Sequence, residues 1–299
     1  MTPPALIAVD IDGTLLASDG TVLPGTRAEF ARARELGATI VLASGRPVAG
    51  LRRLVDRLKL DDRGFVLTGV NGAVSVDAGS GEVLGRHPMG LDLVHEIVTL
   101  AAEHGVIPML CDGDDLVVDR PDDPQVDIEA EGNGLHLRAV PDLGAVTGDD
   151  VTVDKVLFYA RPAVLRPFAE VFVARFGEAT EHSFSAPFYF EATTRGVDKG
   201  SALTDLAAAR GLDPRDSVAF GDNGNDLPLL RAAGLGVAMG NAIPAVLEAA
   251  DRVTASHDDE GIAAVLAELY GDGEPAPLVP EPEGVEPLHA LDLRDEESG

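Results

Sequence analysis

Two aspartates stand directly after the first apolar run of the chain, in the segment Asp10-Ile11-Asp12-Gly13-Thr14. The run predicts a strand, and open parallel sheets bind ligands beyond the carboxyl ends of their strands. Residues two apart on a strand share a face, so both carboxylates can converge, and Gly13 lets the chain turn at once. Such a pair could serve a metal ion or acid–base chemistry. A plain turn with Asp10 as its cap explains the pentapeptide equally well.

A second polar cluster, Gly221-Asp222-Asn223-Gly224-Asn225-Asp226, follows the apolar segment SVAF. We expect Asp222 in the loop and Asp226 in the first turn of the next helix. Carboxylate and amide oxygens are hard ligands that suit Mg²⁺, directly or through a supporting contact. The alternative is an Asn/Gly turn with Asp226 as a helix cap.

Two further signals lie at predicted element ends. Ser44, in Ser44-Gly45-Arg46-Pro47, ends the strand-like TIVLA, where a hydroxyl and the free N–H groups of a helix starting at Pro47 could hold a phosphate. A simple helix cap is the alternative for Ser44. Lys199 precedes a predicted helix over 201–210, where a cation opposes the helix dipole, and this placement favours a functional role over a solvated surface charge.

The elements that must position these residues alternate. An apolar strand over 5–10, a helix over 26–36, a strand over 39–44 and a helix from Pro47 predict a parallel sheet. The segment around DAGSG predicts a hairpin that leaves this sheet. We therefore predict an α/β fold: a Rossmann-like parallel-sheet core formed by 1–84 and 196–270, interrupted by an inserted α+β domain over 85–195.

Composition restricts the partners. The 299 residues carry a net charge of −28, which opposes binding to nucleic acid or to an anionic membrane. One cysteine, no basic apolar leader and no apolar run of about 20 residues predict a cytoplasmic protein without a membrane span. Residues 271–299 hold nine acidic residues and five prolines, so we expect a disordered tail; a partner-binding tail is the alternative.

At this point the chain resembles a known family. AVDIDGT, ASGR, the lysine of GVDKG, and GDNGND followed by GVAMGNA are similar to the four motifs of the haloacid dehalogenase superfamily, in its Cof-like phosphatase branch. The resemblance covers residues 5 to about 270, including the large insertion after the second motif, which would be a cap domain. It does not extend to the acidic tail.

The resemblance implies a role for each motif residue. Asp10 would be the nucleophile that becomes an aspartyl phosphate, and Asp12 the general acid and base. Mg²⁺ would be held by the carboxylates of Asp10 and Asp222 and the backbone oxygen of Asp12, with Asp226 supporting. The phosphoryl group would be bound by the side chains of Lys199, Ser44 and Asn225 and by backbone amides near Ile11 and Gly45.

The inserted domain would choose the leaving group, but here the sequence is less informative. Asn71 resembles a family position near the substrate, although a type I′ turn explains Asn71-Gly72 equally well. Candidate contacts from the insertion, each more readily explained as a surface or packing residue, are Arg120, His182, Tyr189, Glu191 and Arg195.

We therefore expect a Mg²⁺-dependent phosphatase of small phosphorylated metabolites, either sugar phosphates or cofactor phosphates such as those of pyridoxal or a flavin, acting as a monomer or homodimer. A phosphomutase or a phosphate-binding protein without turnover are the alternatives. An ion-pump domain is disfavoured by Asp12 and by the absence of a span. A glycosidase is disfavoured because Asp10 and Asp12 lie too close for inversion, and because it would leave Ser44 and Lys199 unused.

Overall fold

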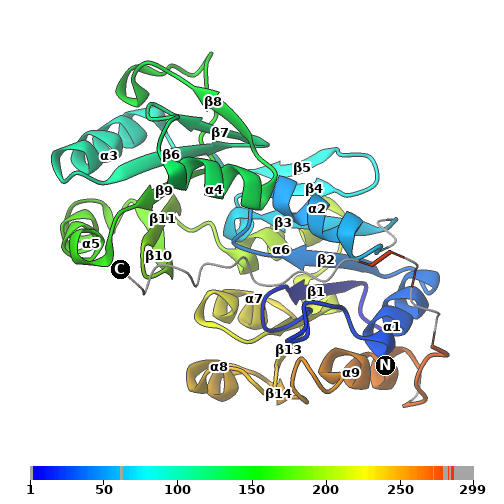
Figure 1. The fold of residues 1–299 in the computed structure, drawn as a ribbon. Coiled ribbons are helices and arrows are strands. Elements are labelled where there is room, and N and C mark those ends of the chain that lie inside the picture. Colours follow the sequence, from blue (N-terminus) through cyan, green and yellow to red (C-terminus); the bar gives the residue numbers. More distant parts are fainter. Residues whose placement is uncertain (1–2, 61–62, 272, 279–281, 283, 286–299) are drawn as a thin grey trace.

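The structure is a computed structural model that describes residues 3–60, 63–271, 273–278, 282 and 284–285. It contains two sheets with helices packed on both (Figure 1). Among the described residues, no helix is both long and apolar enough to cross a membrane. Most of the expected tail over 271–299 lies outside the described residues. Where the chain is described, Glu274 and Ala276 lie against the first helix, bonded to Arg32 and Glu29.

The first sheet has eight strands in the order β14-β13-β12-β1-β2-β3-β4-β5. Neighbouring strands from β14 to β3 run parallel, while β3, β4 and β5 pair antiparallel. The strands are β1 (Leu6–Asp10), β2 (Thr39–Ala43), β3 (Phe65–Gly69), β4 (Val74–Asp77), β5 (Val83–Arg86), β12 (Ser217–Gly221), β13 (Leu235–Ala238) and β14 (Arg252–Val253). Segments from both ends of the chain therefore build one sheet.

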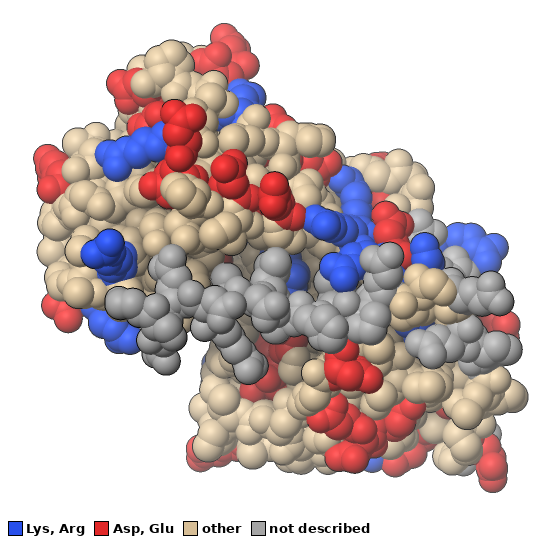
Figure 2. All heavy atoms as spheres, viewed as in Figure 1, with Lys and Arg blue, Asp and Glu red and all other residues tan. Residues whose placement is uncertain are grey.

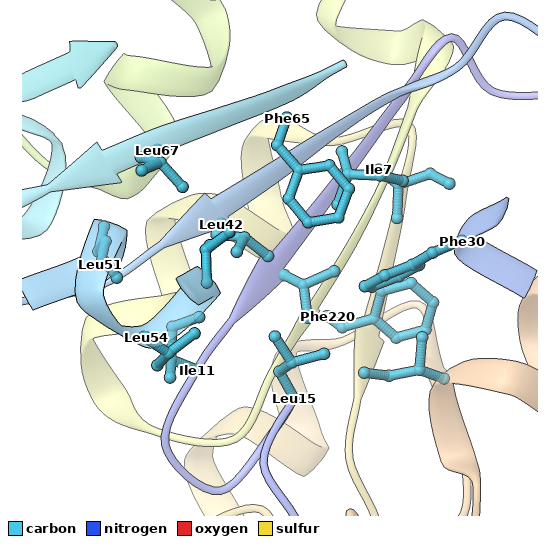
Figure 3. Packing of buried hydrophobic residues seen from close by; sticks show 14 of the residues in the cluster. Ile7, Ile11, Leu15, Phe30, Leu42, Leu51, Leu54, Phe65, Leu67 and Phe220 are labelled. Carbon is cyan, nitrogen blue, oxygen red and sulfur yellow. The ribbon is translucent and has the colours of Figure 1, made fainter. Parts of the chain in front are cut away.

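Helices cover both faces of this sheet because its central strands are apolar on both sides. One face is covered by α1 (Pro24–Glu35), α2 (Val48–Arg57) and α9 (Gly261–Tyr270), and Figure 3 shows Phe30, Leu51 and Leu54 from these helices against Ile7, Leu42 and Phe220 of the strands. The other face is covered by α6 (Lys199–Ala209), α7 (Leu227–Ala232) and α8 (Pro244–Ala249). A parallel sheet buried on both faces explains the nearly continuous apolar strands.

The second sheet lies between β5 and α6 in the sequence and has the strand order β10-β11-β9-β6-β7-β8. Its elements are α3 (Leu91–Glu103), β6 (Ile107–Asp112), β7 (Asp115–Val118), α4 (Pro124–Asn133), β8 (His136–Ala139), β9 (Lys155–Tyr159), α5 (Pro162–Phe176), β10 (Thr180–Ala186) and β11 (Tyr189–Thr194). One of its faces packs on α3 and α5, and the other packs on α4 and on Ala49 of α2. The inserted elements, which we call the cap, thus contact α2, one of the helices that cover the first sheet.

Three local features differ from the sequence-based expectations. The hairpin β4–β5 does not leave the sheet but extends it, and the expected boundary after residue 84 falls inside β5. Helix α6 begins at Lys199 rather than at 201, because Asp198 caps it by accepting from the N–H of Ser201. Helix α4 was not expected.

Candidate active site

The polar residues of the two aspartate clusters meet at one edge of the first sheet. Asp10 is the last residue of β1, Ser44 follows β2, and Asp222 follows β12. Because β12, β1 and β2 are adjacent and parallel, their carboxyl ends bring these residues together, and β1 in the centre carries the carboxylate between the other two.

Lys199 connects the two aspartate clusters. Its Nζ lies 2.5 Å from an oxygen of Asp10 and 2.6 Å from an oxygen of Asp226. Lys199 is 1% exposed, and both carboxylates are buried as well. A buried cation is stable only when it is paired and hydrogen-bonded, and here two carboxylates satisfy it. The start of α6 therefore places an ammonium group against the end of β1.

Burial and neighbouring charges shift the pKa values of Asp10, Lys199 and Asp222. Burial raises the pKa of Asp10 to about 7; Lys199 opposes this effect, while Asp226 and Asp12 add to it. Burial alone would lower the pKa of Lys199, but the charges of Asp10 and Asp226 outweigh it and hold that pKa above its usual value. Burial and the nearby Asp226 also raise the pKa of Asp222. The site therefore holds more negative than positive charge, with the Lys199 ammonium between two carboxylates.

These carboxylates fit a hard divalent cation. Asp10, Asp222 and Asp226 each offer an oxygen within 4.8 Å of the others. Of the three, Asp222 has one oxygen that accepts from the Thr14 hydroxyl at 3.1 Å, which orients the carboxylate. Gly13 makes room for it: a Cβ at that position would lie 2.5 Å from the other oxygen of Asp222. Oxygen donors, excess negative charge and raised pKa values are the properties that a Mg²⁺ ion would satisfy.

Asp226 has a different position from the other two. One of its oxygens accepts from Lys199, and the other accepts from the backbone N–H groups of Asp222 and Asn223, both at 3.0 Å. With both oxygens engaged, Asp226 fixes the loop that carries Asp222. It sits in the short 3-10 helix η4 (Gly224–Asp226) ahead of α7, close to where the sequence places it.

Asp12 lies outside this acidic group. Its side chain is 54% exposed and forms two bonds to Arg46, from Nε at 3.0 Å and from Nη2 at 2.7 Å. Burial would lower the pKa of Arg46, but the bond and charge of Asp12 outweigh it and raise that pKa above its usual value. The sequence singled out Asp12 but assigned no role to Arg46, although Arg46 belongs to the ASGR segment.

The loop after β2 is arranged around Ser44. The Ser44 hydroxyl accepts from the N–H of Arg46 at 3.2 Å, and the Ser44 carbonyl accepts from the N–H of Asn71 at 2.9 Å. Asn71 has a positive φ of 51°, as the Asn-Gly turn predicts, and its side chain accepts from Asn225 at 3.2 Å. Ser44, Asn71 and Asn225 therefore adjoin, as does Gly45, whose Cβ would lie 3.4 Å from Asn71.

Cap residues approach this loop through a buried lysine that the sequence did not single out. Lys155 on β9 is 2% exposed, and its Nζ lies 3.5 Å from the carbonyl of Gly45 and 3.3 Å from Glu191. Glu129 on α4, beside the Tyr189 hydroxyl, adds a second carboxylate, and burial raises its pKa. A buried charge among apolar strand residues was the available signal, since the chain holds three lysines in all.

The five candidate contacts from the cap have different positions. His182 and Glu191 line a cavity shared with Asn71 and Asn225. Tyr189 packs against Tyr159 and Phe188 instead. Arg195 is exposed and pairs with Glu181, and Arg120 is exposed in the connection between β7 and α4.

Comparison with known proteins agrees with this geometry. A family model for haloacid dehalogenase-like hydrolases matches residues 7–266. The chain is 31% identical to the 5-amino-6-(5-phospho-D-ribitylamino)uracil phosphatase YitU of Bacillus subtilis, with 90% of this chain and 98% of that protein covered. It is 29% identical to the pyridoxal phosphate phosphatase YbhA of Escherichia coli, covering 86% and 96%. A haloacid dehalogenase-like hydrolase from Bacteroides thetaiotaomicron superposes with a TM-score of 0.77 at 30% identity, covering 89% and 100%.

Proposed function

This chain belongs to the haloacid dehalogenase-like hydrolases, in their Cof-like branch, and is a phosphatase; from that premise we propose that it hydrolyses small phosphorylated metabolites with Mg²⁺ and through an aspartyl phosphate on Asp10. The observation that carries the proposal is the bridge of Lys199 between Asp10 and Asp226, with Asp222 alongside. A carboxylate facing a phosphate dianion is repelled unless fixed positive charge lies next to both.

In the first step, an oxygen of Asp10 attacks phosphorus and the bond from phosphorus to the leaving oxygen breaks. Asp12 gives its proton to that oxygen, so the leaving group departs as a neutral alcohol. Arg46 holds both oxygens of the carboxylate that remains on Asp12. Lys199 lies against the phosphoryl oxygens as charge moves onto them.

In the second step, water attacks phosphorus and gives a proton to Asp12. The bond between phosphorus and Asp10 breaks, so inorganic phosphate leaves and both aspartates return to their starting states. One exposed carboxylate can serve in both directions because it faces the leaving oxygen first and the water afterwards. Ser44, Asn225 and the backbone N–H groups near Ile11 and Gly45 would hold the phosphoryl oxygens throughout.

The metal would be bound by carboxylate oxygens of Asp10 and Asp222 and by the backbone oxygen of Asp12, with Asp226 holding the loop of Asp222. When bound, Mg²⁺ supplies positive charge to the nucleophile and to the phosphoryl oxygens. The two named relatives act on phosphates with unlike leaving groups, so their names do not choose a substrate for this chain.

The test is phosphate release from a panel of sugar phosphates, nucleotides and pyridoxal phosphate, with and without Mg²⁺, using the wild type and Asp10→Asn. We expect Mg²⁺-dependent release that Asp10→Asn lowers at least about 10³-fold, because the amide cannot act as the nucleophile. Asp149→Asn, an exposed change in the cap, is the matched control and should keep full activity. An Asp10→Asn protein that folds and retains wild-type activity would refute the proposal.

A further inference from the structure

A cavity of about 290 Å³ opens between the cap and the loops of the active site. On the core side its lining includes Asn71, Asp198 and Asn225, and Asn71 is bonded to the loop that carries Ser44. The cavity thus begins beside the proposed phosphoryl site and extends toward the cap. On the cap side it is lined by residues of β10 and β11, namely Glu181, His182, Ser183, Glu191 and Thr193.

The permanently charged residues that line the cavity are all acidic. Three acidic residues line the cavity, Glu181 and Glu191 from the cap and Asp198, which also caps α6, and the described residues of the lining include no lysine and no arginine. Lys155 pairs with Glu191 at 3.3 Å, but it is buried and is not among the described residues that line the cavity. Arg195 pairs with Glu181 at 3.3 Å from the exposed side. The surface offered to a leaving group is therefore rich in hydrogen-bond acceptors and negatively charged.

This lining discriminates by charge. Hydroxyl or ammonium groups of a leaving group can donate hydrogen bonds to Glu181 and Glu191, and bonds to charged partners are the stronger ones. A carboxylate or a second phosphate in the same place would face three acidic residues and no lysine or arginine of the lining, which opposes binding. Asn71 and Asn225 do not alter this balance because amides are neutral.

We propose that the leaving group is a polyhydroxylated or amine-bearing alcohol without a second anionic group, so that this phosphatase prefers phosphorylated polyols and amino sugars and rejects phosphorylated sugar acids. The proposal rests on the proposed function, because it assumes that the phosphoryl group occupies the site next to Ser44. Glu181 and Glu191 are then the residues that set the preference.

Three hexose-sized phosphates of graded charge provide the test at pH 7: glucosamine 6-phosphate, glucose 6-phosphate and 6-phosphogluconate. We expect kcat/KM to fall in that order, with at least about tenfold between the first and the last. Hydrolysis of 6-phosphogluconate as fast as glucosamine 6-phosphate would overturn the proposal. p-Nitrophenyl phosphate is assayed in parallel. If it and the three sugar phosphates are all inert with Mg²⁺, the proposed function fails and this inference fails with it. If the three sugar phosphates are hydrolysed at equal kcat/KM, only this inference is contradicted.

The variant Glu181→Gln assigns the discrimination to the cavity. Glutamine still accepts from the N–H of Gly196, as Glu181 does at 3.0 Å, so the backbone contact is kept while the charge is lost. We expect the ratio of kcat/KM for glucosamine 6-phosphate to that for 6-phosphogluconate to fall several-fold, through KM. Glu170→Gln on the exposed side of α5 is the control and should leave the ratio unchanged. An unchanged ratio in both Glu181→Gln and Glu191→Gln would contradict the assignment.

Discussion

Asp12 and Arg46 show how one residue of a motif depends on its neighbour. The guanidinium holds the Asp12 carboxylate with two bonds, although that carboxylate is half exposed. An acid–base group must face the leaving oxygen within hydrogen-bond distance. With Asp12 as the proposed acid–base residue, Arg46 would act through it, by fixing the direction of the carboxylate and balancing its charge after the proton has left.

We predict that Arg46→Ala lowers kcat about 10- to 100-fold for alkyl phosphates while changing stability by less than about 1 kcal/mol, since partly exposed ion pairs contribute little to folding. p-Nitrophenyl phosphate needs no proton on its leaving oxygen, so its kcat should fall much less. Arg46→Lys keeps the charge but not the two-pronged geometry and should recover part of the loss. Steady-state kinetics on both substrates measure the difference, with exposed Arg166→Ala as the control.

An equal loss on the two substrates would contradict this role.

At this scale the sequence predicted which residues adjoin, because Asp10, Ser44, Lys199 and Asp222 all stand at element ends of one sheet edge. It did not predict Arg46 or Lys155, since a side chain's partner depends on the direction it takes across a loop. For Lys155 that partner comes from α4 and β11, which lie far from it in sequence.

At the scale of elements, the turn after β1 shapes the proposed metal site. Gly13 has a φ of +85°, and a Cβ there would lie 2.5 Å from an oxygen of Asp222. We predict that Gly13→Ala destabilises the protein by about 1–2 kcal/mol through the left-handed backbone and weakens Mg²⁺ binding at least about tenfold by displacing Asp222. Urea unfolding and calorimetric titration with Mg²⁺ measure the two effects.

Gly37 separates the two causes. It has a similar φ of +92°, but no atom lies within 4 Å of the position that a Cβ would take there, so Gly37→Ala meets the same backbone strain without a collision. It should lose comparable stability and keep wild-type affinity for Mg²⁺. If both variants bind Mg²⁺ equally well, the close approach of Gly13 to Asp222 has no role in the site.

The elements themselves were predicted unevenly, and α4 shows why. Its buried positions are Val126, Glu129, Ala130 and Asn133, which follow the helical spacing but are half polar, so the apolar pattern is lost. Glu129 is buried because it faces Lys155 and accepts from Asn133. The hairpin β4–β5 was expected to leave the sheet but extends it. The expectation was wrong because an alternating pattern predicts strands without saying which sheet edge they join.

At the scale of the whole molecule, the acidic surface and the site work against each other. Figure 2 shows acidic side chains over both the cap and the core, and the net charge of −28 repels a phosphate ester at long range. Binding must then come from short-range groups, which is consistent with the buried Lys199 ammonium and with three carboxylates beside it that could hold a metal ion. The net charge could be read from the sequence, whereas the acceptor-rich cavity depends on how the cap packs against the core.

The single cysteine can report on whether the hydrophobic core of the cap stays packed. Cys111 on β6 is fully buried between the cap sheet and α4, and burial raises its pKa to about 12. The thiolate is the reactive form, so at pH 8 a thiol with that pKa is ionised roughly 10³-fold less than an unfolded cysteine. We predict that a disulfide reagent labels the native protein at least about 10³-fold more slowly than the urea-unfolded chain, and that Cys111→Ser removes the signal. Cys111 is the chain's one cysteine and lies in the cap, so its labelling at increasing urea concentration reports on the opening of the cap. A rise in labelling at urea concentrations where the helix content is still native would mean that the cap opens first. Rapid labelling without urea would contradict the burial of Cys111 and with it the packing of α4, the helix that places Glu129 near Lys155 of β9.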